Sequence, residues 1–231
     1  MTDEKKKTLN RTELVEQLEE LARIEPSKVS KIMAMCYYPA RLGKEQMKTL
    51  HTMHEEFGRK FAANLSALLQ AVVEVKLTGV DELAYSEFTF GLDNPTCLNL
   101  LRVEPLKENW LLDINPAFLY PITDYLLDGG KEPTMATRRS LTDTEQQIAL
   151  KVTKIILQEL KSAWKNVIEL EFEVIQTESD PQRLQLFPPN ELVIVLCFEI
   201  IFADKRGSIT LCLPYQSFES LEKMKNDFTQ T

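Results

Sequence analysis

Three side chains near the beginning of the chain have the chemistry of a metal site. His51, His54 and Glu55 lie close together, and positions i and i+3 share one face of a helix. Imidazole and carboxylate groups are ligands of transition metals. No further strong ligand is evident in the pattern, and an amphipathic helix needs an exposed polar face in any case. We therefore interpret these residues as the solvated face of a helix and predict no metal site.

Thiol chemistry is the next alternative. The 4 cysteines are dispersed, without the spacing of a zinc site: Cys36, Cys97, Cys197 and Cys212. A chain of 231 residues is large enough to fold without disulfide bonds. We predict reduced thiols buried in the core, with Cys197 and Cys212 on neighbouring strands but not joined.

The usual motifs of nucleotide-binding enzymes and hydrolases are missing. With 7 glycines and 2 histidines, the sequence has no Gly-x-x-x-x-Gly-Lys-Ser/Thr loop, no Gly-x-Gly-x-x-Gly turn, no Gly-x-Ser-x-Gly elbow and no His-Glu-x-x-His pair. We therefore predict a protein that is not an enzyme and has no cofactor.

A short basic segment is the remaining candidate for function. Gly129 and Gly130 have the pattern of a helix C-terminus, where glycine adopts a positive φ. Lys131, Arg138 and Arg139 follow them in a protein whose net charge is -8. These groups could present a basic surface to a protein partner, but charges in a solvated loop give the same pattern. The local residues leave both interpretations open.

Composition excludes two classes of function. A net charge of -8 opposes the attraction to phosphate on which nucleic-acid binding depends. No apolar segment approaches the roughly 20 residues of a membrane-spanning helix. The charged N-terminus lacks the continuous apolar region of a signal peptide. The sequence therefore predicts a cytoplasmic protein that binds no nucleic acid.

The elements that must position these residues begin with a long helix. Apolar residues from Lys44 to Gln70 fall on one helical face. Four β-type segments follow and predict an antiparallel meander: residues 71–80, 82–92, 96–106 and 109–114. A further helix is expected to start at Asn115-Pro116 and to end at Gly129-Gly130.

The same order of elements then recurs. Thr142 and Glu145 form a capping box at the start of a helix that extends to about Trp164. Strands are predicted at residues 167–176, 191–203 and 208–214, and a closing helix at 215–228. This repetition predicts an internal duplication and a pseudo-twofold α/β domain. A separate amphipathic helix is expected at residues 10–24.

Several stretches, taken in order, resemble the middle domain of the FliM family of flagellar motor switch proteins. They cover most of the chain between residues 37 and 221: YYPARLGKEQMKTLHTMHEEFGRKFAANLSALL, YSEFTFGLDNPTCLNLL, LLDINPAFLYPITDYLLDGG, RRSLTDTEQQIALKV with SAW later in that helix, and GSITLCLPYQSFESL. The order of these matches makes the resemblance more specific than any one of them.

The resemblance implies a CheC/FliM-like, three-layer α/β/α domain with an antiparallel-rich sheet and long helices packed on it. It divides the chain into an N-terminal segment and linker (1–36), the domain (37–228) and a tail (229–231). It also implies a non-catalytic adaptor of the rotor's cytoplasmic ring at the flagellar basal body, peripheral to the inner membrane. Such an adaptor associates with neighbouring FliM-like subunits, binds FliG and transmits the chemotaxis signal that controls the direction of rotation.

In that family a Gly-Gly-x-Gly loop contacts FliG. The resemblance places this contact at Gly129, Gly130, Lys131, Arg138 and Arg139, although the second part of the motif is missing here and the loop is shorter. The segment TELVEQLEEL is a distant candidate for binding phosphorylated CheY. No SpoA-type domain follows Phe228, which is expected either of a trimmed chain or of a shortened paralogue with a different partner.

The main alternative is an enzyme with the same fold. CheC and CheX phosphatases act on phosphorylated CheY through a Glu-x-x-Asn pair on a long helix. Neither long helix of this chain contains that pair, and Lys151 and Lys154 occupy nearby positions where an acceptor group would be needed. A scaffold unrelated to motility is the third alternative.

Overall fold

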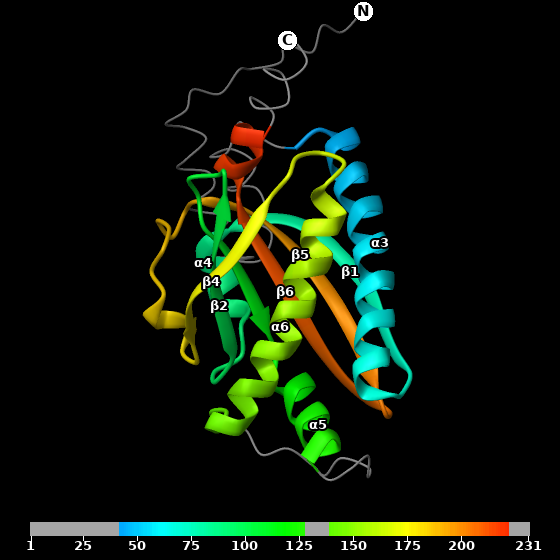
Figure 1. The fold of residues 1–231 in the computed structure, drawn as a ribbon. Coiled ribbons are helices and arrows are strands. Elements are labelled where there is room, and N and C mark those ends of the chain that lie inside the picture. The colour runs from blue at the N-terminus through cyan, green and yellow to red at the C-terminus, as the bar shows by residue number, and fades with distance from the viewer. Residues whose placement is uncertain (1–41, 128–138, 222–231) are drawn as a thin grey trace, which may run out of the picture. The chain divides into compact units, whose positions relative to one another are not determined.

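A long helix, three strands and a shorter helix follow one another twice along the chain (Figure 1). The structure, a computed structural model, describes residues 42–127 and 139–221. The elements of the first half are α3 (Lys44–Leu69), β1 (Val73–Ala84), α4 (Tyr85–Gly91), β2 (Cys97–Glu104), β3 (Trp110–Ile114) and α5 (Pro116–Leu127). The second half contains α6 (Asp143–Trp164), β4 (Glu171–Glu178), the 3-10 turn η1 (Pro181–Arg183), β5 (Leu192–Phe202), β6 (Lys205–Pro214) and a helical segment at residues 215–221.

The order of the strands confirms the predicted duplication. The strands form one 6-stranded sheet in the order β1-β5-β6-β3-β2-β4, and all the pairs described are antiparallel. Exchanging each strand with its counterpart in the other half (β1 with β4, β2 with β5, β3 with β6) reverses this order and leaves every pairing intact. Each half therefore completes the sheet of the other around a pseudo-twofold axis between β6 and β3.

The first strand of each half also carries a bulge. In β1, Thr78 has no partner in the register between Leu77 and Gly79, and in β4 Ile175 is skipped in the same way. A bulge increases the local twist of an antiparallel pair. Its presence in both first strands extends the pseudo-symmetry to a detail that strand order alone does not require.

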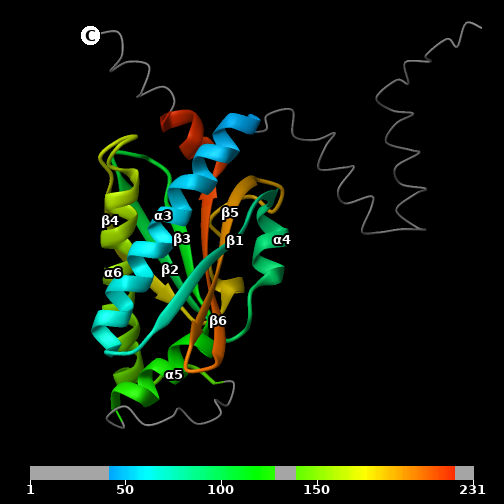
Figure 2. The same ribbon diagram turned by 90° about the vertical axis from the view of Figure 1, so that its right-hand side faces the viewer.

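Helices cover the two faces of the sheet unequally, and Figure 2 shows the three layers from the side. On one face lie the two long helices α3 and α6, with buried residues at helical spacing: Leu50, Phe57, Phe61 and Leu65 in α3, and Ile148, Val152, Ile156, Leu160 and Trp164 in α6. The short helix α4 lies on the other face. The antiparallel sheet between layers of helices confirms the predicted α/β/α class. None of the helices in the described ranges is long and apolar enough to cross a membrane.

One predicted strand is wrong. Residues 82–92 were expected to be extended, but β1 ends at Ala84 and α4 begins at Tyr85. The side chains of Tyr85 and Phe88 are both buried against the sheet, and a spacing of three residues places them on one side of a helix. The Tyr85 hydroxyl donates to the carbonyl of Leu184 at 2.6 Å. Tertiary burial thus overrides the β propensity of this aromatic segment.

The predicted meander is also wrong, because β1 does not pair with β2. Its partner is β5, from the second half of the chain, in a register that runs from Val73 opposite Phe202 to Ala84 opposite Leu192. Only β2 and β3 form a hairpin within the first half. The spacing of strands along a sequence favours pairing between neighbouring strands. It contains no signal that a strand of one half pairs with a strand of the other half.

Close packing against β6 fixes the position of α5. The helix begins at Pro116, as predicted, and the Asn115 side chain accepts a hydrogen bond from the Ala117 amide at 2.8 Å. A Cβ atom added to Gly207 of β6 would lie 2.4 Å from Cβ of Phe118. Only a glycine permits this approach, and α5 then extends beyond the sheet at the end opposite the start of α3 (Figure 1).

Candidate protein-binding site

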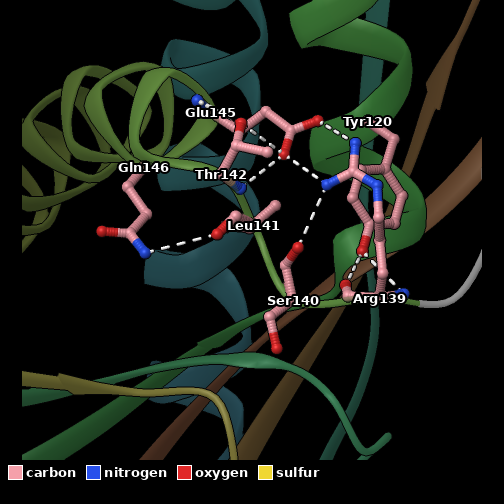
Figure 3. A network of polar contacts seen from close by, with 7 residues as sticks. All are labelled: Tyr120, Arg139, Ser140, Leu141, Thr142, Glu145 and Gln146. Carbon is pink, nitrogen blue, oxygen red and sulfur yellow. Dashed lines mark hydrogen bonds and ion pairs between the residues drawn. The ribbon is translucent and has the colours of Figure 1, made fainter.

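The described chain resumes after α5 at Arg139, which is the only one of the five predicted FliG-loop residues within the described ranges. Gly129, Gly130, Lys131 and Arg138 lie outside them. Arg139 precedes α6 and lies beside α5, so it occupies the junction of two elements that bracket the predicted loop (Figure 3).

The guanidinium group of Arg139 forms a two-pronged ion pair with Glu145 in the first turn of α6. Its Nη1 and Nη2 atoms lie 2.7 and 2.6 Å from Oε2 and Oε1 of the carboxylate. The Arg139 side chain is 49% exposed and that of Glu145 only 6%. These bonds from Arg139, together with bonds from Thr142, lower the pKa of Glu145 to about 2, so its carboxylate is charged at neutral pH.

Glu145 also connects this ion pair to the start of the helix. Its Oε2 atom accepts the Thr142 amide at 2.6 Å, and the Glu145 amide is 3.4 Å from Thr142 Oγ1. The predicted capping box is therefore confirmed. One carboxylate thus satisfies the helix N-terminus and binds the arginine at the same time.

Tyr120 joins α5 to the same group. Its hydroxyl donates to the carbonyl of Arg139 and accepts the Arg139 amide at 3.3 Å. The guanidinium carbon lies 5.3 Å from the centre of the Tyr120 ring, which is a cation-π contact. We call Tyr120, Arg139, Thr142 and Glu145 the junction cluster. The role of Tyr120 has no signal in the sequence, since nineteen positions separate it from Arg139.

Apolar side chains are exposed next to the junction cluster. Leu126 and Leu127, at the end of α5, are 36% and 59% exposed, whereas Leu119 and Ile122 of the same helix are fully buried. Exposed leucines at the end of a helix suit apolar contact with a protein partner.

Comparison with known proteins identifies the family of the chain. Residues 43–229 match the family model described as flagellar motor switch protein FliM. The chain belongs to the FliM family. A curated FliM from Treponema pallidum is 35% identical over 191 residues, which is 82% of this chain and 55% of that protein. The chain thus spans little more than half the length of this relative.

Solved FliM structures share the fold. The FliM middle domain from H. pylori superposes with a TM-score of 0.71 and 29% identity, over 78% of this chain and 98% of that one. A structure described as the FliG-FliM complex from H. pylori contains a similar chain, with a TM-score of 0.72 and 30% identity over 75% of this chain and 94% of that chain. The predicted resemblance to the FliM middle domain is confirmed.

The histidines of this FliM-family chain do not share a surface. His51 is exposed and lies 3.6 Å from Glu55, as a solvated helix face predicts. His54 contradicts that prediction, because it is fully buried between the helices and its Nδ1 donates to the Leu50 carbonyl at 2.8 Å. Burial lowers the pKa of His54 to about 4. The two imidazoles therefore point into different surroundings and cannot bind one metal ion.

The cysteines lie largely as predicted. Cys97 and Cys212 are buried, Cys197 is half-buried, and the thiols of all three are free. Cys197 and Cys212 lie on the paired strands β5 and β6, where Cys212 is opposite Val195 and Cys197 is opposite Thr210. Burial raises the pKa of each of these thiols, that of Cys97 to about 11. Cys36 lies outside the described residues.

A small cavity lies beside the junction cluster, between α6 and the edge of the sheet. Its volume is about 230 Å³, and polar uncharged side chains form much of its wall. The ionisable groups in its lining are Cys97 and Glu178. Because the Cys97 thiol is protonated at neutral pH, it has little nucleophilic character.

Proposed function

We propose that this chain is a non-catalytic adaptor of the flagellar motor switch. In this role it binds FliG at the end of α5, associates with neighbouring FliM-like subunits in the rotor ring and transmits the signal that sets the direction of rotation. The observation that carries the proposal is the likeness to the FliM chain in the solved FliG-FliM complex, which extends over 94% of that chain at 30% identity. Pre-organised interfaces change little between related free and bound structures.

The proposed FliG-binding residues are Gly129, Gly130, Lys131, Arg138 and Arg139. Two features of the described residues support this location. Leu126 and Leu127 expose apolar surface immediately before the segment, and Arg139 is bonded to both α5 and α6 immediately after it. The leucines would give a partner apolar contact, and the bonds of Arg139 would hold the other end of the segment in place.

The rest of the assignment follows from the same proposal. The domain would comprise residues 37–228, with a tail at 229–231. The N-terminal segment, residues 1–36, would be the part available to phosphorylated CheY. The protein would lie at the cytoplasmic face of the inner membrane, as part of the basal body.

The long helices argue against the phosphatase alternative. The Asn64 amide of α3 donates to the Glu159 carboxylate of α6 at 2.7 Å, and Glu159 is 8% exposed. The acid is therefore buried and bonded to the amide across the two helices, and it is not presented to a partner. Lys151 and Lys154 occupy the exposed face of α6. A non-catalytic role agrees with this arrangement.

Charge reversal tests the proposed location. Lys131→Glu should weaken binding of FliG about tenfold or more, because a like charge at an interface is repelled by an acidic partner. Lys44→Glu is the control, since Lys44 is an exposed lysine at the start of α3, at the other end of the molecule (Figure 1). Calorimetric titration measures both affinities.

Equal effects of the two substitutions would place the contact elsewhere. In parallel, the decay of phosphorylated CheY should not accelerate when the chain is added. Acceleration would establish the phosphatase alternative and refute the proposed function.

A further inference from the structure

We propose that Arg139 is a positioning residue. It joins the start of α6 to α5 through its own side chain and backbone, and binding of FliG depends on this connection and not on the charge of Arg139. This inference rests on the proposed function, because it assigns a role to one residue of the proposed FliG site. It differs from the simplest expectation for a basic residue in a binding segment, which is direct pairing with an acidic partner.

Three of the five N–H donors of the Arg139 side chain are bonded within the protein. Nη1 donates to Glu145 Oε2 and, at 3.0 Å, to the carbonyl of Ser140, while Nη2 donates to Glu145 Oε1. One face of the guanidinium group lies against the Tyr120 ring. A partner would have to break a bidentate ion pair to bind these donors, and such pairs are among the strongest polar contacts in proteins.

The backbone of Arg139 is held as firmly as its side chain. Both its amide and its carbonyl bond to the hydroxyl of Tyr120, which is 5% exposed in α5. The side chain is bound to α6 and the main chain to α5, as Figure 3 shows. Arg139 therefore joins the two helices that bracket the proposed site. Its own backbone is held at a fixed position relative to both helices.

Lysine cannot substitute for arginine in this role. Its ammonium group keeps the charge but lacks the planar fork that matches a carboxylate. A substitution of Glu145 also distinguishes the effect of the charge of Arg139 from the effect of its position. Its side chain is 6% exposed, so a partner can hardly touch it, and glutamine in its place preserves the capping box while it removes the negative charge.

The test compares Arg139→Lys, Glu145→Gln and the double variant with the intact chain. Calorimetry measures the affinity for FliG, at a temperature at which all variants are folded. Amide hydrogen exchange over residues 120–127 and 139–148 reports the junction without FliG. The control is Arg102→Lys, because Arg102 forms an ion pair of the same 2.7 Å length with Glu173 and is 51% exposed.

We expect Arg139→Lys and Glu145→Gln each to weaken FliG binding about tenfold and to accelerate exchange in both segments. The affinity of the double variant for FliG should be about equal to that of the weaker-binding single variant, because both substitutions break the same ion pair. Arg102→Lys should change the affinity less than about twofold, since exposed ion pairs contribute little.

Two results would overturn the inference. Full affinity of Arg139→Lys would show that a positive charge is sufficient. Loss of affinity in Arg139→Lys with no effect of Glu145→Gln would show that FliG contacts Arg139 directly. If the intact chain does not bind FliG, the proposed function fails, and amide hydrogen exchange alone then tests the junction cluster. Faster exchange of the variants in both segments would support the positioning role of Arg139. Unchanged exchange would refute it.

Discussion

Replacement of Gly207 by alanine tests how α5, and with it the proposed binding site, is held on the sheet. The added Cβ atom would lie 2.4 Å from Cβ of Phe118 and 2.8 Å from its Cα and N atoms. Ordinary van der Waals contact begins at 3.4 Å. Because these atoms belong to the backbone and to Cβ, no change of rotamer relieves the clash. The helix and the strand must separate by about 1 Å.

Such overpacking destabilises a protein by about 1–3 kcal/mol. In a protein of this size, each kcal/mol lowers the unfolding midpoint by about 2–4 °C. We therefore expect Gly207→Ala to lower the free energy of unfolding by about 2 kcal/mol and the midpoint by about 4–8 °C. Urea titration followed by circular dichroism, together with a thermal scan, measures both quantities.

Gly91→Ala is the matched control. Gly91 ends α4, and a Cβ atom added there would meet nothing within 4 Å. Removal of a helical glycine at a site with room stabilises a protein by about 0.4–1 kcal/mol through the unfolded state. The two substitutions should therefore have opposite signs. Equal stability of Gly207→Ala and the original chain would refute the close approach of Phe118 to β6.

Two further predictions concern polar groups. The folded-state pKa of His54, about 4, is below the usual 6.5, so the unfolded state gains a proton first as the pH falls. Between pH 6.5 and 4 the chain should lose roughly 3 kcal/mol of stability relative to His54→Leu. Comparison with this variant in urea at each pH is essential, because Asp113, whose pKa burial raises to about 7, acts in the opposite direction. A constant difference between the two proteins would contradict a buried neutral His54. At the junction cluster, Thr142→Ala should lower the free energy of unfolding by about 1 kcal/mol through loss of the helix cap. Thr144→Ala, at an exposed position, should change it by less than about 0.5 kcal/mol. Equal effects of the two substitutions would show that the Thr142 cap does not stabilise the helix.

Local signals predicted the two long helices well. The capping box of Thr142 and Glu145 and the apolar spacing of α6 placed that helix within a residue of its observed bounds. The same was true of α3, whose face repeats every three or four residues. The recurrence of these elements also predicted the duplication, because the order of elements survives when residue identity is lost.

Non-local signals were missing for the remaining features. The aromatic spacing of Tyr85 and Phe88 is ambiguous in sequence, and only burial against the sheet makes it helical. The pairing of β1 with β5 joins residues more than one hundred positions apart. His54 looked like part of a polar face because neighbouring residues are polar, but its own position falls on the buried stripe between Leu50 and Phe57.

The location of the candidate site stays a prediction, and the contacts of Arg139 had no signal in the sequence. Sequence resemblance indicated the segment from Gly129 to Arg139, and exposed Leu126 and Leu127 lie beside it. The ion pair of Arg139 with Glu145 spans six positions outside any helical repeat. The hydrogen bonds between the Tyr120 hydroxyl and the backbone of Arg139 depend on the packing of α5. Neither contact has a sequence signal, so the bonds that Arg139 forms within the protein could not be predicted.

We propose above all that this chain binds FliG through the segment that follows α5. The most direct test is calorimetric titration of the intact chain with the middle and C-terminal domains of its cognate FliG, alongside Gly130→Asp. We expect saturable binding that the substitution abolishes or weakens strongly, while circular dichroism shows the fold unchanged. Absence of binding by the intact chain, or undiminished binding by Gly130→Asp, would contradict it.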